Sequence, residues 1–218
     1  MCGRFALYSS INNVKKVFGV GTAVGELKPS YNIAPGDEVY AIIKRKDNRL
    51  GKLRWGFVPP WAKNLSGSSR LINARAETLQ EKASFKRAFK ERRCLIPADG
   101  FYEWKDKEPW YCTPATDTLF GFAGLWETWQ GTDQSPYRSC TIITTEASES
   151  IRAIHDRMPV ILKPEAIEEW LDPAVTDYDR LNVILEQGQV TRVRTYPVSK
   201  HVDSPRNNDP RCIEVVTD

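Results

Sequence analysis

Residues 94–104 read CLIPADGFYEW, a short run dominated by apolar and β-favouring side chains. Such a run is typical of β-structure rather than of a long helix. Similar runs recur on both sides of it: VYAII (39–43), KLRWGFV (52–58), WYCT (110–113), LFGFAGLWETW (119–129), CTIITT (140–145), PVIL (159–162), RVRTYPV (192–198) and CIEVV (212–216). Many short strands with turn residues between them predict a curved antiparallel or mixed sheet with a barrel-like shape.

Helical patterns are fewer, and each follows a capping residue or a proline or shows apolar residues at helical spacing. We expect helices that begin at Ser9 or Ser10, run from about Leu79 to Arg92, lie near Ala147 to Ile154, begin at Pro164, and begin after Asp177 and end at Gly188. With these helices packed outside the sheet, the predicted fold class is α+β, rich in β.

Length and composition predict one ordinary globular domain over residues 1–218. The chain is 41% hydrophobic and 27% charged, and its formal net charge is only +3. Neither disorder nor a fibrous architecture fits these values, and the charge permits a nucleic-acid partner without requiring one. Because the chain has no apolar run of about 20 residues and no secretory signal pattern, we expect a cytoplasmic protein with no membrane partner.

The five cysteines are odd in number, widely spaced and contain no Cys-x-x-Cys pair. This pattern argues against a disulfide framework and a zinc site, and we expect no metal and no cofactor. Four of them are expected to be buried small residues. Cys2 differs, because removal of Met1 would leave a free amine and a thiol on neighbouring carbons.

An N-terminal cysteine can trap an aldehyde. The amine condenses to an imine, and the thiol then closes a five-membered thiazolidine ring. With unperturbed pKa values of about 7.7 to 8.0 for the amine and about 8.5 for the thiol, both nucleophiles are partly available at neutral pH. The alternative is that Cys2 is simply a small residue in a first strand.

His155 and Glu103 are candidates for proton transfer. His155 lies in IHDRMPVIL, where a predicted helix gives way to a strand, and imidazole exchanges protons near neutral pH. A structural pair with Asp156 is the alternative. Glu103 lies among aromatic residues in DGFYEWK, where burial would raise its pKa. Alternation would put it on the same face as Phe101, and a cross-strand salt bridge is the alternative.

Two further segments suggest substrate contacts. In LINARAET, Asn73 and Arg75 stand two residues apart, so an extended chain would project both in one direction, an amide for orientation and a guanidinium for an anion. The alternative is that both side chains only support a loop through hydrogen bonds. In RWGFVPPWAK, we expect Trp55 and Phe57 to be buried and Trp61 to be exposed, where it could stack on a base.

Six motifs in order, MCGRF, YNIAPG, RWGFVPPW, LINARAET, CLIPADGFYEWK and IHDRMPVIL, closely resemble the SRAP family, the SOS response-associated peptidase-like proteins that shield abasic sites in single-stranded DNA. The resemblance implies that Met1 is removed and that Cys2 forms a stable thiazolidine crosslink with the aldehyde of an abasic deoxyribose. It also implies that Asn73 positions the sugar or Cys2, that Glu103 assists proton transfer, and that His155 promotes opening of the sugar.

The resemblance further implies a path for DNA. Arg4, Arg75 and Arg157 would line this path, and Pro35 and Trp61 would stack on bases or wedge a duplex apart. At Ala62, where relatives can carry a second tryptophan, the sequence departs from the family. The expected partner is single-stranded DNA with abasic sites, bound by a monomer that is associated with the nucleoid when the DNA is damaged.

Three other functions compete with this interpretation. N-terminal-nucleophile amidohydrolases also begin with Met-Cys-Gly, but they use an Asn-Gly pair, and this chain has no Asn-Gly dipeptide. A cysteine peptidase built from Cys2, Glu103 and His155 is the second, at most for self-processing after Met1. A simple single-strand DNA-binding module with an incidental cysteine is the non-enzymatic alternative.

Overall fold

The computed structural model describes residues 2–65, 71–115, 119–131 and 135–216, so Met1 and its removal lie outside the described residues. The strands are β1 (Phe5–Leu7), β2 (Val20–Ala23), β3 (Ser30–Ile33), β4 (Glu38–Lys44), β5 (Asn48–Trp55), β6 (Asn73–Arg75), β7 (Arg93–Ala98), β8 (Gly100–Lys105), β9 (Glu108–Pro114), β10 (Phe120–Gln130), β11 (Pro136–Glu146), β12 (Arg157–Pro159), β13 (Ile161–Leu162) and β14 (Val193–Pro197).

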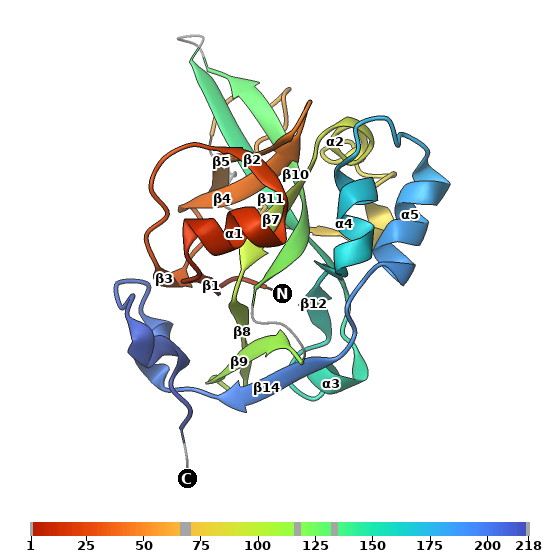
Figure 1. The fold of residues 1–218 in the computed structure, drawn as a ribbon. Coiled ribbons are helices and arrows are strands. Elements are labelled where there is room, and N and C mark those ends of the chain that lie inside the picture. Colours follow the sequence, from red (N-terminus) through yellow and green to blue (C-terminus); the bar gives the residue numbers. More distant parts are fainter. Residues whose placement is uncertain (1, 66–70, 116–118, 132–134, 217–218) are drawn as a thin grey trace.

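Five strands close into a barrel. They pair in the order β11-β10-β7-β4-β5, and β5 then returns to β11. The first four pairings are antiparallel, whereas β5 and β11 run parallel, with Arg54 opposite Ser139. Closure removes the exposed edges that an open sheet would leave. The predicted barrel-like mixed sheet and the β-rich α+β class are therefore confirmed, and the barrel forms the upper half of the molecule in Figure 1.

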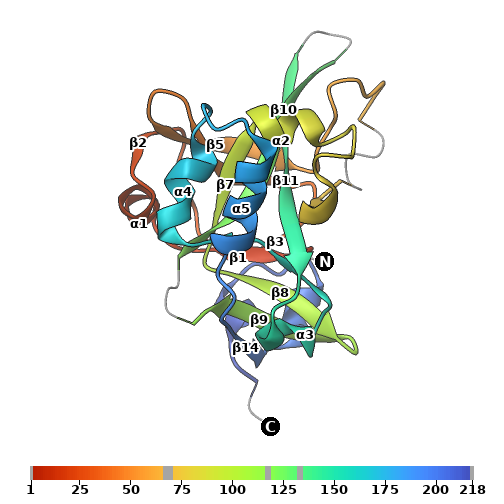
Figure 2. The ribbon, with the colours of Figure 1, turned by 90° about the vertical axis from the view of Figure 1, so that its right-hand side faces the viewer.

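A second sheet lies below the barrel in both ribbon views (Figures 1 and 2). Its strand order is β14-β9-β8-β1-β3. Phe5 on β1 reaches into the barrel core, where the centroid of its ring lies 5.2 Å from that of Trp55 and 5.7 Å from that of Phe122. Aromatic burial of this kind joins the sheet to the barrel.

Alternation along β8 separates two faces, as predicted. Phe101 lies 6.0 Å from Phe122 in the barrel core, whereas Tyr102 and Trp104 belong to a smaller apolar cluster on the opposite face. The C-terminal segment covers that second face with the 3₁₀ helices η3 (Lys200–Asp203) and η4 (Pro210–Ile213). Glu103 therefore points to the side where the sheet meets the barrel.

The α-helices are α1 (Ile11–Val17), α2 (Lys86–Glu91), α3 (Glu149–Arg152), α4 (Pro164–Leu171) and α5 (Tyr178–Gln187). Three helices, α1, α4 and α5, begin where Ser10, Pro164 and Asp177 predict. Ser10 caps α1 and Asp177 caps α5 through side-chain hydrogen bonds to the third residue beyond each cap, and α5 ends at Gly188 as expected.

Two predicted helices are shorter than expected. The segment from Leu79 to Arg92 is helical only from Lys86, after the separate 3₁₀ helix η2 (Ala76–Thr78), and α3 spans four residues. Before Lys86 the backbone forms hydrogen-bonded turns, and the ring of Phe85 packs in the core with its centroid 5.4 Å from that of Phe57. Tertiary packing overrides helix propensity here.

One predicted strand is wrong. CIEVV (212–216) begins in η4 and then makes only an isolated bridge, between Val215 and Val198. All five cysteines are buried free thiols. Within the described residues, the helices are too short and too polar for any of them to cross a membrane.

Candidate active site

β1 and β8 bring the start of the chain beside Glu103. Phe5 pairs with Phe101 in antiparallel register, and the Tyr102 N–H donates to the Arg4 carbonyl at 2.9 Å. Residues before Phe5 therefore run alongside residues after Phe101.

Cys2 is fully buried, and its Sγ lies 4.0 Å from the Arg4 carbonyl oxygen. Burial raises the pKa of the Cys2 thiol well above its usual range, and the negative charge of nearby Glu103 raises it further. The sulfur is thus a neutral thiol at neutral pH. The expectation of a partly ionised thiol, drawn from unperturbed values, is wrong at this point.

Glu103 is a buried carboxyl with 3% of its surface exposed. Burial raises its pKa to about 7, and the charge of Asp156 contributes in the same direction. Both protonation states of Glu103 are therefore populated near neutral pH. A carboxyl in this condition can accept and return a proton without a large free-energy cost.

His155 lies at the junction of α3 and β12, with its Nε2 4.0 Å from Glu103 Oε2. Its Nδ1 lies 2.8 Å from Asp156 Oδ1, and the Arg157 N–H donates to the same Nδ1 at 2.9 Å. Burial lowers the pKa of His155, which favours the neutral imidazole.

A neutral imidazole carries its proton on only one nitrogen. When Nδ1 accepts the Arg157 N–H, the proton stands on Nε2 and faces Glu103. When Nδ1 instead donates to Asp156, Nε2 carries no proton and is an acceptor. The predicted structural pair of His155 with Asp156 is therefore present, and it lies beside a group suited to proton transfer.

β11 brings the segments LINARAET and IHDRMPVIL together, because it pairs with a strand from each. Its Thr144 pairs with Arg75 of β6 on one edge and with Pro159 of β12 on the other. Asn73 is the first residue of β6, and both polar atoms of its side chain are buried without a hydrogen-bond partner among the described residues. Because a buried amide without partners is costly, this one calls for a ligand or water.

The three predicted arginines differ in what they contact. Arg157 forms a two-pronged ion pair with Glu77, at 2.7 and 3.0 Å, and donates to the Thr144 carbonyl. Arg4 Nη1 donates to Asn32 Oδ1 at 2.7 Å and to the Val202 carbonyl at 2.9 Å. Arg75 is exposed. Of the three, Arg75 presents the most accessible guanidinium.

Pro35 and Trp61 are both exposed, and Trp61 shows 64% of its surface. Trp55 and Phe57 are fully buried, so the predicted division among these aromatic residues is confirmed. Beside Trp61, the Ala62 carbonyl accepts a hydrogen bond from Trp129 Nε1 at 2.7 Å. The sequence interpretation did not single out Trp129, because only the β10–β11 hairpin brings it to this segment.

Sequence reasoning also missed Asn32, although it lies inside the motif YNIAPG. Its 3% exposure is a signal that only the structure supplies. His201 is partly buried in η3, and its Nε2 lies 3.0 Å from Asp209 Oδ2.

The described residues contain no cluster of three or more His, Cys, Asp or Glu side chains suited to a metal. Two cavities of about 710 and 800 Å³ lie elsewhere, and neither is lined by Cys2, Glu103 or His155. The candidate site is an arrangement of buried and partly buried polar groups near the start of β1.

Comparisons with known proteins agree with this fold. A family model described as SOS response associated peptidase (SRAP) matches residues 1–205. The abasic site processing protein YoqW of Bacillus subtilis is 46% identical over 98% of this chain and 99% of its own length. The abasic site processing protein HMCES of Xenopus tropicalis is 32% identical, over 99% of this chain and 78% of its own length.

Solved structures show the same architecture. A Bacteroides thetaiotaomicron protein superimposes with a TM-score of 0.88 at 23% identity, covering 99% of this chain and all of its own. A phage-related protein from Bordetella bronchiseptica superimposes with a TM-score of 0.72 at 31% identity, covering 90% of this chain and 94% of its own. The chain belongs to the SOS response associated peptidase family.

Proposed function

We propose that this protein processes abasic sites in single-stranded DNA by forming a covalent crosslink through Cys2. The names of the relatives YoqW and HMCES support abasic-site processing. The finer proposal is that removal of Met1 frees the Cys2 amine, and that amine and thiol together bind the lesion as a thiazolidine. The bound protein then shields the lesion.

The reaction balances with one water released. The amine attacks the aldehyde carbon of the opened sugar and, after loss of water, leaves an imine. The Cys2 sulfur then forms a bond to the imine carbon, and the proton lost by the thiol is returned to the nitrogen. The product is a five-membered ring that holds sugar and protein together. Selectivity follows, because intact DNA offers no aldehyde.

The observation that carries this proposal is the burial of both the Cys2 thiol and the Glu103 carboxyl, which raises the pKa of each, that of Glu103 to about 7. A thiol with a raised pKa does not ionise alone, so its proton has to pass to a base as the sulfur bond forms. Glu103 is suited to that task, because it holds and releases a proton near neutral pH. The same raised pKa disfavours a cysteine hydrolase, which attacks as a preformed thiolate.

His155 is proposed to open the sugar. Opening the hemiacetal removes a proton from the C1′ hydroxyl and adds one to the ring oxygen. A neutral imidazole can perform either transfer, and the alternative partners of its Nδ1 leave Nε2 able to donate or to accept. Its position 4.0 Å from Glu103 would let the two groups exchange a proton.

Asn73 is proposed to orient the sugar. Its amide oxygen and nitrogen have no partner among the described residues, so a sugar hydroxyl could satisfy both, by donating to Oδ1 and accepting from Nδ2. Arg75, two residues further on the same strand, would then meet a neighbouring phosphate.

The remaining DNA contacts follow from exposure. Trp61 and Pro35 are exposed and could stack on unpaired bases. Arg4 and Arg157 already bond to the protein, so DNA contact by either would require an exchange of partners. For these two residues the contact stays a prediction, and Arg75 is the arginine that we assign to the DNA path.

The test uses protein without Met1, verified by intact mass, and a single-stranded oligonucleotide with one abasic site. We expect a heat-stable adduct whose mass equals protein plus DNA minus one water. Cys2→Ala should abolish it, whereas Cys94→Ala, which changes another fully buried cysteine, should retain it.

A second arm distinguishes the thiazolidine from a simple imine. Cys2→Ser keeps the amine but removes the sulfur, so its adduct should appear only when borohydride is added. A heat-stable adduct formed by Cys2→Ala at the wild-type level would contradict the mechanism. So would wild-type protein that yields an adduct only after reduction.

A further inference from the structure

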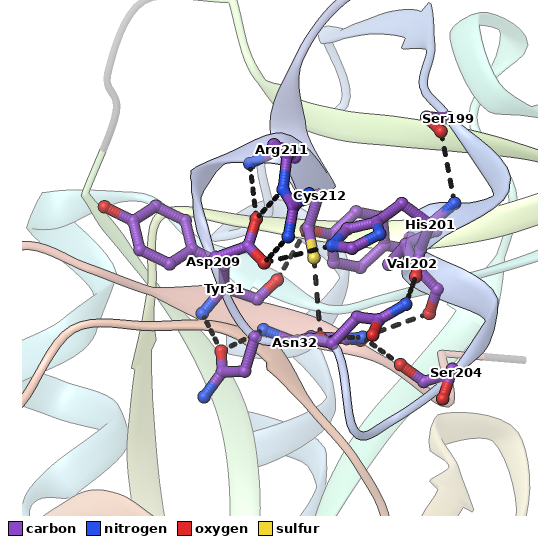
Figure 3. Close-up of polar contacts among 12 residues, drawn as sticks. Tyr31, Asn32, Ser199, His201, Val202, Ser204, Asp209, Arg211 and Cys212 are labelled. Carbon is purple, nitrogen blue, oxygen red and sulfur yellow. Dashed lines mark hydrogen bonds and ion pairs between the residues drawn. The ribbon is translucent and has the colours of Figure 1, made fainter.

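Asn32, on β3, lies at the centre of a polar network. Its Oδ1 accepts from Arg4 Nη1 at 2.7 Å. Its Nδ2 lies within hydrogen-bond distance of three carbonyls, those of Val202 (3.0 Å), Ser204 (3.0 Å) and Asn207 (2.7 Å). Figure 3 shows the amide with dashed lines to Val202 and Ser204.

Every polar atom of this side chain is therefore engaged, and the side chain is nearly fully buried. An amide group has two N–H bonds, so three acceptors share them. A primary amide can donate two N–H bonds to carbonyls and accept from an arginine at the same time. Aspartate could keep the arginine contact but would turn the three donations into repulsions.

The three carbonyls belong to one segment, residues 199–213, which we call the C-terminal clasp. Its Asn208 Oδ1 accepts from the Tyr31 N–H at 2.6 Å and from the Asn32 N–H at 3.1 Å. Its Asp203 Oδ1 accepts from Trp104 Nε1 at 2.8 Å. The clasp thus holds β3 and β8, the two strands on either side of β1.

Within the clasp, Asp209 is the central acceptor. His201 Nε2 lies 3.0 Å from Asp209 Oδ2, and the Arg211 guanidinium donates to both oxygens of the same carboxylate. These contacts connect the two 3₁₀ helices, as Figure 3 shows. The clasp is therefore a folded unit and not a loose tail.

Arg4 connects this network to Cys2. Its guanidinium bonds to Asn32 and to the clasp, and its carbonyl accepts from the Tyr102 N–H and lies 4.0 Å from Cys2 Sγ. Both ends of Arg4 are thus held, and Cys2 is only two residues away. A small shift of Arg4 would move the sulfur relative to Glu103, and misplacement of a reacting group slows a reaction strongly.

We propose that Asn32 is a positioning residue, which ties Arg4 to the C-terminal clasp and so holds Cys2 in place against Glu103. The effect on crosslinking rests on the proposed function, whereas the effect on the sulfur itself does not. Asn32 acts through Arg4 and needs no contact with DNA.

The experiment compares Asn32→Asp with Asn48→Asp. Asn48 is the matched control, because its amide also donates to a backbone carbonyl, that of Phe18, at 3.0 Å, and it lies at the barrel, away from the clasp. Single-turnover crosslinking at saturating DNA should be about tenfold slower in Asn32→Asp, the size expected when a buried hydrogen-bond network is broken. Affinity for undamaged single-stranded DNA should stay within about twofold of wild type.

The two aspartate variants also separate positioning from general destabilisation. Asn48→Asp should lose thermal stability but crosslink at the wild-type rate. Equal rates for Asn32→Asp and Asn48→Asp would overturn the proposal. If Asn32→Asp fails to fold, Asn208→Ala, at an exposed position, replaces it. This change removes the side-chain oxygen that accepts from the N–H groups of β3, so crosslinking should slow by about threefold. An unchanged crosslinking rate for Asn208→Ala would also overturn the proposal.

A third measurement is independent of DNA. Alkylation of Cys2 by iodoacetamide, read by peptide mass spectrometry, should be about tenfold faster in Asn32→Asp, because the sulfur is no longer held in its buried position. Cys94, fully buried in the barrel, is the internal reference. If wild-type protein forms no crosslink, the proposed function fails, and this alkylation rate still decides the positioning role. An unchanged rate relative to Cys94 would refute it.

Discussion

Glu103 is the residue at which the local environment changes the chemistry most clearly. Its side chain is neutral in acid and charged in base, with the transition at about pH 7 instead of at the ordinary value of 4.5. The cause is burial on the face of β8 that meets the barrel. A buried carboxylate costs free energy, so this position has a measurable effect on folding as well as on reactivity.

The stability of the protein should therefore depend on Glu103 with a definite sign. Since the folded-state pKa is raised, the contribution of this group is fully present below the unfolded value and is lost as the pH rises through 7. Glu103→Gln, which mimics the neutral acid, should come within about 1 kcal/mol of wild type at pH 5 and exceed it by about 3 kcal/mol at pH 8.

Urea denaturation at the two pH values measures this difference. The exposed Glu81→Gln is the control, and it should shift both curves equally. A wild-type protein that is as stable as Glu103→Gln at pH 8 would contradict a raised pKa at this position.

At the scale of elements, the antiparallel pair β8–β9 depends on close contact between a glycine and a ring. Gly100 begins β8, and a Cβ placed there would overlap the ring of Tyr111 on β9. That ring belongs to an aromatic layer, with centroids 5.1 Å from Tyr102 and 5.4 Å from Tyr196. Because the ring is held on both sides, it cannot move aside at little cost.

Gly100→Ala should therefore destabilise the protein by about 1 to 3 kcal/mol, as overpacking of a filled core does. Thermal or urea unfolding measures the loss. Gly51→Ala is the matched control, because a Cβ at Gly51 on β5 would meet nothing within 4 Å. Similar losses for the two variants would show that the Tyr111 ring does not limit this position.

At the scale of the whole molecule, β1 is shared by two structures. It lies between β3 and β8 in the second sheet, while Phe5 packs on Trp55 and Phe122 in the barrel. Cooperative unfolding is expected where one core serves both parts. That residues 1–218 form a single domain stays a prediction, and it can be tested directly.

We expect one unfolding transition in urea, with coincident midpoints for far-ultraviolet circular dichroism and tryptophan fluorescence. Phe5→Ala should lower both midpoints together, since its ring joins the two sheets. Two separated transitions, or a fluorescence change that precedes the loss of circular dichroism, would indicate independent units.

The sequence by itself determined the β-rich fold class, most of the strands, the capping of α1 and α5, and the division of Trp55, Phe57 and Trp61 between core and surface. Each of these follows from short-range physics, namely alternation along a strand, local hydrogen bonds at a cap, and the hydrophobicity of single side chains. The candidate chemistry of Cys2, Glu103 and His155 also followed from residue type.

Only the tertiary structure decided the rest. Closure of the barrel by the parallel β5–β11 pairing, the short α2, and the 3₁₀ helix and isolated bridge in place of a strand at residues 212–216 depend on partners distant in the chain. The burial of the Cys2 thiol, the raised pKa of Glu103 and the hydrogen bond from Arg4 to Asn32 also depend on distant parts of the chain. Desolvation and hydrogen bonding between distant segments are set by packing, and packing cannot be read from local pattern.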